Sequence, residues 1–525
     1  MNSEVEEEQS LKGPEIFLGV VGALGTDLAL VEKALQAALA EVDYKPIQIR
    51  LSDLLMKVVG ADEDLPSDPT ALAGRKMDAG NAFRVRAKRT DAVALLAIVE
   101  IVNERKKRSK EGKPVERGAY ILRQLKTPEE VHVLRKVYGK NFYLIAAYCP
   151  KKQRLQNLSR KNAALRHEPE SRKFEPQALD LMLRDEVEHG NEYGQNVRAT
   201  FPLADYFLNT ATVPEIEAGT KRFIELLFGH PVRTPTKDES SMFQAFGAAL
   251  RSSAGRQVGA AIATADGQIL SVGTNEVAKA FGGQYWDGDG SDGRDYTRFP
   301  DSTGAMVDSI LADLIARLKK ANWLAPAHGE KSTEQILEAW KKDLLEPFRE
   351  LDKDAPPSLR ERALIKNLIE YLRPVHAEMA AICASSRRGI ATENASLYSS
   401  TFPCHECARN IVAAGIREVI FIEPYPKSRV EEMFDDSIVV DDSDKSSHVI
   451  FRAFTGVAPR KYVEFFSAPE RDHNGKWIEW EEVKRRRSPR NATEVWYTAG
   501  EPEYVRLAEL SINQPKKENG NAPKG

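Results

Sequence analysis

Four residues in the second half of the chain have the types and spacing of a metal site with a proton-transfer group beside it. They are His376, Glu378, Cys404 and Cys407, in the segments His-Ala-Glu and Pro-Cys-His-Glu-Cys. Two thiolates and one imidazole suit zinc, and three protein ligands leave the fourth tetrahedral position to water. Because zinc lowers the pKa of a bound water towards about 7, such a site can generate hydroxide at neutral pH. We therefore predict Zn2+ as the cofactor, held by His376, Cys404 and Cys407, with Glu378 as the catalytic acid and base.

Both ligand segments are expected at the starts of helices. Glu378 lies two positions after His376, and on a regular helix these residues would lie on nearly opposite faces. They can face one ion if His376 enters the helix and Glu378 lies in its first turn, which Pro374 just upstream favours. A proline also precedes Cys404 in a segment with helical apolar spacing. This places Cys404 and Cys407 in a first turn, where the helix dipole favours thiolates.

The Cys-x-x-Cys segment has other interpretations, since such a pair is often a redox motif or half of a structural zinc site. The companion His-x-Glu, whose histidine lies 28 residues before Cys404, favours a third one. This combination is the signature of zinc-dependent deaminases. Cys383 lies two turns beyond His376, too far along the helix to bind the metal, and is expected to be a small core residue.

The composition is that of a protein with more than one globular domain. Its 525 residues are 42% hydrophobic and 29% charged, and no apolar run approaches the roughly 18 residues of a membrane-spanning helix. The 4 cysteines make no disulfide framework and the acidic start lacks the features of a secretory signal, so we expect a cytoplasmic protein without membrane contact. A net charge of -3 argues against a polynucleotide substrate, which usually requires a basic excess.

The pattern of apolar residues predicts an α/β protein with two domains. In residues 14–230, short β-branched or aromatic segments alternate with amphipathic ones, which is typical of a parallel sheet covered by helices. The polar stretch 231–238 marks the boundary, and a second α/β domain is expected over 240–511. Residues 1–13 and 512–525 lack apolar periodicity and are expected to be disordered.

The second domain is expected to build its sheet from a hairpin and two later strands, and to carry a long helical insertion. An Ala-Asp-Gly turn at 265–267 joins the first two strands. The insertion, 281–372, opens with a Gly- and Asp-rich segment, and segments this long usually serve as lids, gates or oligomer contacts. Within it, Tyr285 and Trp286 could cover a substrate base. The predicted strands are 259–265, 268–273, 396–400 and 418–422.

A glycine-bearing turn after the first predicted strand resembles the phosphate loop of nucleotide-binding proteins. It consists of Gly22, Ala23, Leu24, Gly25, Thr26 and Asp27. Compared with the pattern G-x-x-x-x-G-K-[ST], Val20 replaces the first glycine, Thr26 the lysine and Asp27 the hydroxyl residue. Without the lysine, phosphoryl transfer loses its main charge stabiliser. We therefore expect a degenerate loop whose amides bind a nucleotide, with an inert structural turn as the alternative.

Charged positions in the first domain are further candidates for ligand contacts. Asp78, Asn81 and Arg84 share one predicted helix, and the Arg-Asp-Glu segment at 184–186 lies on another. Charged helix faces are, however, more often solvated. The basic runs 105–110 and 484–490 lack interleaved aromatic residues and are also expected to be solvated rather than to bind RNA.

The second half of the chain resembles the deoxycytidylate deaminases. The resemblance is carried by His-Ala-Glu, by RQVGAAIAT at 256–264, by GTNEV at 273–277 and by LYSSTFPCHECARNIVAAGIREVIFIEPYPKS at 397–428. With a degenerate P-loop domain ahead of it, the chain is similar to bacterial antiphage dCTP/dCMP deaminases, which carry an amino-terminal nucleotide-kinase-like domain. This resemblance implies a cytidine-deaminase-like three-layer α/β/α domain with zinc between two helix starts. It also implies a homo-oligomer that depletes deoxycytidine nucleotides during phage infection, with a regulatory nucleotide at the amino-terminal domain and an inhibitory RNA as candidate partners.

The same resemblance suggests which residues contact the substrate. In deoxycytidylate deaminases an Asn after the second strand contacts the nucleotide, and Asn275 matches it. That family often reads Asn-Gly-x-Pro-Arg at this point, whereas here Lys279 takes the place of the arginine and the proline is absent. Arg256, which opens the first matching segment, is the third candidate for substrate binding.

The predicted reaction is the zinc-dependent hydrolytic deamination of a free deoxycytidine nucleotide, dCTP, dCMP or both, to the deoxyuridine nucleotide. Glu378 would move a proton from the zinc-bound water to N3 of the pyrimidine while hydroxide attacks C4 and ammonia leaves. One alternative is a deaminase of single-stranded DNA or RNA, which needs a basic groove and stacking aromatics. The other is a nucleotide sensor with a relic zinc site.

Overall fold

The computed structural model describes residues 13–63, 65–188, 191–298, 302–343, 365, 371–423, 428–442, 447–466, 471–485, 487–490, 492 and 496–513. The chain divides into two compact units. The first combines Met1–Glu188, Glu192–Phe243 and Ala453–Gly525, and the second combines His189–Asn191 and Gln244–Arg452. None of the helices within the described ranges is long and apolar enough to span a bilayer.

This division differs from the predicted one at its carboxy-terminal end. Residues from Ala453 onwards, expected to belong to the second domain, cluster with the first unit. There β14 (Gly456–Val457) pairs with β5 (Tyr206–Asn209), and α20 (Tyr497–Ile512) packs on α5 (Ala92–Arg108). A local pattern can show that a segment is amphipathic, but it does not say which distant surface the apolar face will cover.

The first unit is built on a six-stranded sheet in the order β14-β5-β4-β1-β3-β2. Every neighbouring pair from β5 to β2 is parallel, and β14 alone joins antiparallel. The predicted parallel sheet is therefore confirmed. Its other strands are β1 (Ile16–Gly22), β2 (Lys45–Arg50), β3 (Gly118–Arg123) and β4 (Phe142–Tyr148).

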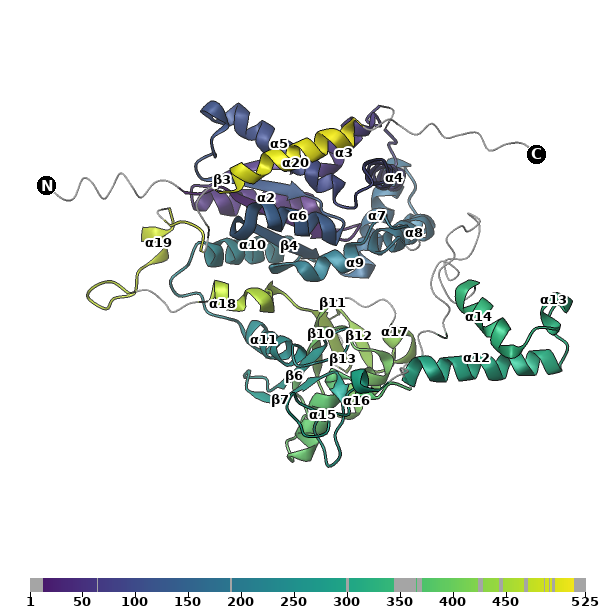
Figure 1. Ribbon diagram of the computed structural model, residues 1–525. Helices are drawn as coiled ribbons and strands as arrows, with labels where there is room; N and C mark the ends of the chain where they lie inside the picture. Colours follow the sequence, from purple (N-terminus) through teal and green to yellow (C-terminus); the bar gives the residue numbers. More distant parts are fainter. Residues whose placement is uncertain are drawn as a thin grey trace, which may run out of the picture. The chain divides into compact units, whose positions relative to one another are not determined.

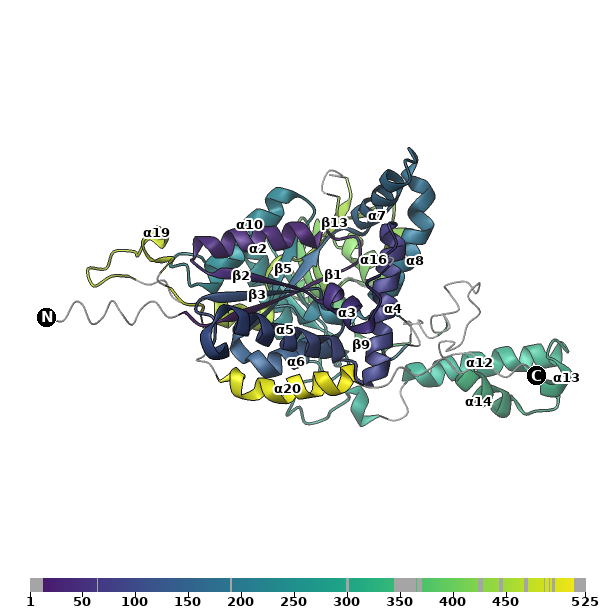
Figure 2. The same cartoon turned by 90° about the horizontal axis from the view of Figure 1, so that it is seen from above.

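Helices cover both faces of this sheet. Ile16 and Leu18 of β1 belong to an apolar cluster with residues of α2 and α10. Phe17, which points the other way, stacks on Tyr138 of α6 with ring centroids 3.7 Å apart and meets Tyr497 of α20 edge-on. Figure 1 shows the unit from the side, and Figure 2 shows α2 and α10 on one side of the strands and α5, α6 and α20 on the other. Besides α5 and α20, the described helices of this unit include α2 (Leu28–Glu41), α3 (Leu51–Val59), α4 (Pro69–Ala87), α6 (Pro128–Tyr138), α7 (Lys151–Leu165), α8 (Glu175–Glu186), α9 (Val197–Thr200), α10 (Val213–Leu227), α18 (Tyr462–Phe465) and α19 (Trp480–Val483).

The second unit contains a six-stranded mixed sheet in the order β12-β13-β11-β10-β6-β7. The predicted hairpin is confirmed: β6 and β7 pair antiparallel, and the Gly267 amide donates to the Thr264 carbonyl at 2.9 Å across the turn. The central strand β10 runs antiparallel to β6 and parallel to β11. The strands are β6 (Gly259–Ala263), β7 (Ile269–Thr274), β10 (Ser396–Thr401), β11 (Glu418–Glu423), β12 (Ile438–Val440) and β13 (Val449–Ala453), and a separate pair joins β8 (Glu276–Val277) to β9 (Pro374–Val375).

Two helices pack so closely against opposite faces of the β6–β7 hairpin that their backbones leave no room for a side chain at the contact points. A Cβ atom at Gly259 would overlap the Ala245 carbonyl of α11 (Lys237–Ala249), and one at Gly273 would overlap the Ala377 carbonyl of α15 (Ala377–Arg387). Gly273 pairs with Ala260, the neighbour of Gly259, so the two glycines face opposite sides of the sheet. The result is three layers, as expected. The other helices here are α16 (His405–Ala413) and α17 (Val430–Met433).

The predicted insertion contains a helical hairpin. α12 (Ser302–Lys320) is the amphipathic helix that the sequence predicts, and its Val307 and Leu311 pack with Leu337 and Trp340 of α14 (Thr333–Asp343). The short helix α13 (Pro326–Gly329) lies between them in the chain. Residues 299–301, 344–364 and 366–370 of the insertion lie outside the described residues, as do 1–12 and 514–525 of the two ends.

Candidate metal centre

Strand pairing brings His376 to the start of α15. β9 pairs with β8 and ends at Val375, so the chain leaves a fixed antiparallel pair and enters the helix at the next residue. His376 is the N-cap residue of α15, and Glu378 lies in its first turn. Ser271 of β7 secures the helix further along by donating a 2.9 Å hydrogen bond to the Ala381 carbonyl. The predicted local arrangement of His376 and Glu378 is confirmed.

Cys404 and Cys407 come from the helix that follows the central strand of the sheet. Cys407 lies in the first turn of α16, as predicted, and Cys404 is the N-cap residue just before the first turn in which it was expected. Each Sγ lies 3.3 Å from His376 Nδ1, and the three donor atoms lie within 4.8 Å of one another. Bond lengths of about 2.3 Å to sulfur and 2.1 Å to nitrogen in a tetrahedron place such atoms roughly 3.5 Å apart. The donor set and its spacing therefore fit one zinc ion.

The two thiols are electrostatically poised for a cation. A hydrogen bond from Cys407, together with His376, lowers the pKa of Cys404 to about 4 against the opposing effect of burial. The same hydrogen bond and burial raise the pKa of Cys407. One thiolate is thus already favoured, and a cation at the three donor atoms would favour the second.

Glu378 lies beside these donors in a buried position. The residue is 4% exposed, and its Oε2 atom is 3.4 Å from Cys407 Sγ. Burial raises the pKa of Glu378, which suits a carboxyl group that must both accept and donate a proton near neutral pH.

Sequence reasoning missed Ser399, which contacts this carboxylate. Ser399 is fully buried in β10, and its hydroxyl donates to Glu378 Oε1 at 3.2 Å. The available signal was a serine at a buried position of a central strand, where a polar side chain needs a partner. Cys383, in contrast, is exposed on α15 and is not the core residue that was expected. The face of α15 that packs on the sheet carries Ala381 and Ser385 instead.

The three predicted substrate-binding residues have partners within the second unit. The Asn275 side chain accepts from the Val258 amide and donates to the Arg256 carbonyl, both at 2.7 Å. It therefore fixes the entry to β6, although an amide retains further donor and acceptor capacity for a ligand. The Lys279 ammonium lies 3.0 Å from the Asp289 carboxylate, and the Arg256 guanidinium pairs with Glu423. Their roles in substrate binding remain predictions.

The two aromatic residues proposed as a cover contact cationic side chains that precede the insertion in the chain. The Trp286 ring lies under the Arg251 guanidinium at 4.0 Å from its centroid, and the Tyr285 ring lies 5.8 Å from the Lys279 ammonium. Trp286 remains 55% exposed, so part of its ring is accessible to a ligand.

The glycine-bearing turn of the first unit bonds to other parts of the chain. The Leu24 amide, one of those offered to a phosphate, donates to Asp185 Oδ2 at 2.7 Å. Asn157 donates to the Gly25 carbonyl at 3.1 Å, and the Thr26 amide bonds to Ala23 within the turn. The Leu24 amide is thus already hydrogen-bonded to a carboxylate of the protein. Asp27 is the N-cap residue of α2.

Several charged residues expected to be solvated are buried instead. Arg84 is 2% exposed and pairs with Glu130 at 2.6 Å, and Asp185 is fully buried and pairs with Lys126 at 2.5 Å. Arg105, at the start of a basic run, is also 2% exposed. Each is buried together with an opposite charge, and sequence spacing alone does not reveal such a partner because it lies far away in the chain.

The part of the chain that holds the metal centre is similar to known proteins. Residues 235–423 match the model of the cytidine and deoxycytidylate deaminase zinc-binding region, and this range contains His376, Glu378, Cys404 and Cys407. Over 55 residues the chain is 36% identical to the deoxycytidylate deaminase of Enterobacteria phage T2, covering 10% of this chain and 29% of that protein. Over 103 residues it is 35% identical to the deoxycytidylate deaminase of Mus musculus, covering 19% of this chain and 53% of that protein.

Among solved structures, the dCMP deaminase of the cyanophage S-TIM5 in complex with dCMP and dUMP aligns at 13% identity with a TM-score of 0.21, over 42% of this chain and 98% of that one. The chain spans about half or less of the length of the two relatives above. Most of the matched range 235–423 lies in the second unit, which is thus similar to a deaminase zinc-binding region. The two relatives matched within the second half of this chain are both deoxycytidylate deaminases.

Proposed function

We propose that this chain is a zinc-dependent hydrolase that removes the 4-amino group of a free deoxycytidine nucleotide, dCMP, dCTP or both. The observation that carries the proposal is the buried Glu378 carboxylate, 3.4 Å from Cys407 Sγ and next to a set of three donor atoms. A purely structural zinc site usually has four protein ligands and has no use for a buried acid beside them.

The residues around the centre would divide the chemistry between them. Zinc held by His376, Cys404 and Cys407 would lower the pKa of a water molecule, which is what the hydrolysis needs at neutral pH. Glu378 would accept a proton from this water and deliver it to N3 of the cytosine ring, which makes C4 more electrophilic. Ser399 would hold the carboxylate in position through its hydrogen bond to Oε1.

The direct test is turnover by the purified full chain with dCMP, dCTP, CTP, dATP and single-stranded DNA, with ammonia and products measured. We expect release of ammonia from a free deoxycytidine nucleotide, and loss of this activity on chelation with recovery on addition of Zn2+. Glu378→Gln should lower kcat by about 10² to 10⁴-fold while the zinc content stays unchanged, because the proton carrier is lost but the ligands remain.

Glu406→Gln is the matched control, since Glu406 lies between the two cysteines in the chain but contributes no donor to the three-residue group. It should keep nearly full activity. Normal turnover by the Glu378 variant, or a zinc-loaded protein that is inactive on every free cytosine nucleotide, would contradict the proposal.

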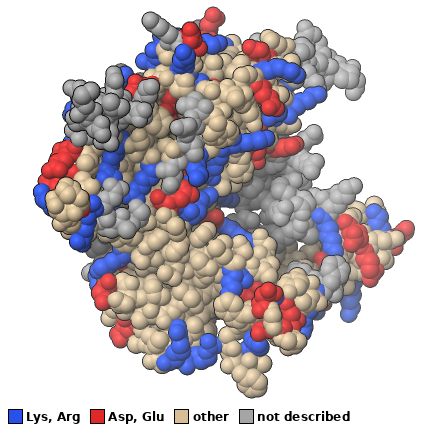
Figure 3. Space-filling view, turned by 60° about the vertical axis from the view of Figure 1, so that its left-hand side comes forward, with Lys and Arg blue, Asp and Glu red and all other residues tan. Residues whose placement is uncertain are grey.

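A deaminase of single-stranded DNA or RNA is the rival enzyme function. On the face shown in Figure 3, Lys and Arg side chains are mixed with Asp and Glu, and wide areas carry neither. This distribution and the net charge of -3 favour a small substrate over a polynucleotide. Turnover of single-stranded DNA with a steep salt dependence would favour the rival.

A nucleotide sensor with a relic zinc site is the rival outside enzyme chemistry. It is disfavoured because the proton carrier Glu378 is present and buried beside the donor atoms.

In the wider role that we propose, a cytoplasmic homo-oligomer depletes deoxycytidine nucleotides during phage infection and is restrained by RNA until then. Unchanged dCTP and dCMP pools in infected cells that carry the gene would contradict this role.

A further inference from the structure

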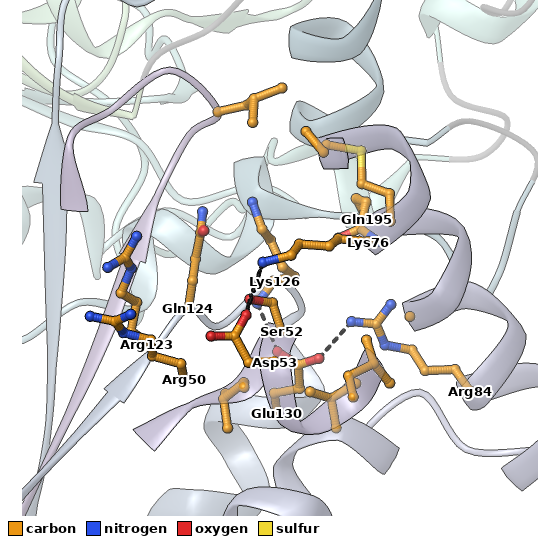
Figure 4. Close-up of a pocket in the computed structure, with 17 residues that line it drawn as sticks. Arg50, Ser52, Asp53, Lys76, Arg84, Arg123, Gln124, Lys126, Glu130 and Gln195 are labelled. Atoms are coloured by element: carbon orange, nitrogen blue, oxygen red, sulfur yellow. Dashed lines mark hydrogen bonds and ion pairs between the residues drawn. The ribbon is translucent and has the colours of Figure 1, made fainter. Parts of the chain in front are cut away.

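A cavity of about 280 Å³ lies within the first unit, apart from the residues of the metal centre. It opens where β1, β2 and β3 end, and α3 and α4 form its other walls (Figure 4). Ligands of open parallel sheets commonly bind at the carboxyl ends of the strands, and the volume is near the lower end of the range for small-molecule sites. The cations that line it are Arg50, Lys76, Arg84, Arg123 and Lys126.

Two of these cations, Arg50 and Arg123, share the carboxylate of Glu32, and the Asp53 carboxylate near Arg50 is already paired with Lys76. Arg50 and Arg123 are register partners on β2 and β3, and Figure 4 shows them side by side. Both reach Glu32 Oε2, at 3.6 Å and 3.0 Å respectively. Arg50, Arg123 and Lys76 thus have two carboxylates between them, those of Glu32 and Asp53, which leaves an excess positive charge. A phosphate would neutralise this charge and accept bidentate hydrogen bonds from both planar groups.

The remaining cations each have a close carboxylate partner. Lys76 pairs with Asp53 at 2.9 Å, Arg84 with Glu130 at 2.6 Å, and Lys126 with Asp185 at 2.5 Å. Arg84 and Glu130 are almost fully buried, so this part of the wall is held in place before any ligand arrives. The net excess of positive charge is therefore at the Arg50–Arg123 side, and we place the anionic group there.

The glycine-bearing turn does not offer the same anion position. The Leu24 amide already bonds to Asp185, and Asp185 is in turn held by Lys126. A phosphate at that amide would have to displace a buried carboxylate. Leu24 itself nevertheless lines the cavity, so the turn forms part of the cavity surface but does not bind the phosphate.

Other parts of the lining can accept a less polar group. Leu51, Leu55 and Met77 supply apolar surface. Gln124 and Gln195 each donate one hydrogen bond within the unit, and their side-chain amides keep further capacity for the edge of a base. One anionic end and one flat, partly apolar body with polar edges describe a nucleotide.

We propose that this cavity binds a nucleoside 5′-monophosphate, with the phosphate at Arg50 and Arg123 and the base towards α3 and α4. The choice of a nucleotide over other organic phosphates rests on the proposed function, in which the same chain acts on nucleotides. The site is a binding site without phosphoryl transfer, since the turn beside it has Thr26 and Asp27 where a kinase loop has its lysine and hydroxyl residue.

The test is isothermal titration of the zinc-loaded full chain with dTMP, dAMP, dGMP and inorganic phosphate, none of which contains a cytosine ring. We expect at least one nucleotide to bind, with phosphate alone weaker. Arg50→Gln and Arg123→Gln should each weaken binding about tenfold or more, as expected for the loss of a charge-assisted hydrogen bond. Arg160→Gln, an exposed arginine on α7 outside the lining, is the matched control and should bind as the unaltered chain does.

Three results would overturn the proposal: no nucleotide binding, nucleotide binding that neither arginine variant weakens, or phosphate that binds as tightly as the nucleotides. Deamination of dCMP and dCTP is measured on the same preparations. An active deaminase without nucleotide binding at the arginine pair would refute only this cavity, whereas an inactive chain that binds nucleotide there would refute only the proposed reaction.

Discussion

At the scale of single residues, the contact between Ser399 and Glu378 connects the sheet to the proposed chemistry. The Ser399 hydroxyl stabilises the charged form of a carboxyl whose pKa burial already raises. Ser399→Ala should therefore raise the pKa of Glu378 further, so that the carboxylate needed by the free enzyme appears only at higher pH. We expect the acid limb of the kcat/KM profile to move to higher pH and activity at neutral pH to fall about threefold to tenfold, with zinc content unchanged. Ser396→Ala is the control. Ser396 also lies on β10 and its hydroxyl also donates to a carboxylate, but to that of Glu418 on β11. An unshifted profile for the Ser399 variant would exclude the positioning role.

At the scale of elements, the packing of α15 on β7 determines where His376 and Glu378 lie. A methyl group at Gly273 would overlap the Ala377 carbonyl, which belongs to the first residue of the helix, and would come against the Ala381 amide. The helix would have to move away from the strand. Gly273→Ala should therefore lower the thermal midpoint, by an amount equivalent to roughly 1–3 kcal/mol, and should reduce zinc content and turnover together. In Gly247→Ala of α11 the new methyl group meets nothing within 4 Å, and replacing a helical glycine should leave stability equal or raise it by up to about 1 kcal/mol. A Gly273 variant with full zinc content would show that α15 is not held in this way.

At the scale of the whole molecule, a buried charge cluster joins segments of the first unit that lie far apart in the chain. The Arg105 guanidinium of α5 bonds to Glu15, just before β1, at 2.9 Å and to Glu501 of α20 at 2.6 Å. Removing the arginine would leave two buried carboxylates without their cation, whereas removing one carboxylate leaves a neutral pair. Arg105→Met should thus destabilise the first unit by about 3–5 kcal/mol, and Glu501→Gln by less. The measurement is thermal unfolding together with hydrogen exchange of the α20 amides. Arg108→Met, at an exposed pair with Glu104, should stay within about 0.5 kcal/mol of the unaltered chain. Equal effects of the Arg105 and Glu501 variants would contradict this explanation.

The sequence by itself determined the local features of this protein. The His-x-Glu and Cys-x-x-Cys spacings predicted which side chains begin α15 and α16, since the first turn of a helix depends on neighbouring residues. The hairpin at 265–267 could be predicted for the same reason, because a turn pattern spans only a few residues. The alternation of strand and helix patterns predicted that the sheet of the first unit is parallel, but not the order of its strands.

Only the tertiary structure decided which distant groups meet. It assigned β14 and α20 to the first unit, brought Asp185 to the Leu24 amide, placed Ser399 against Glu378 and set Arg50 beside Arg123. Each of these contacts joins residues from separate elements. Their burial depends on the shape of the packed chain and on the need to pair every buried polar group, which no single segment encodes.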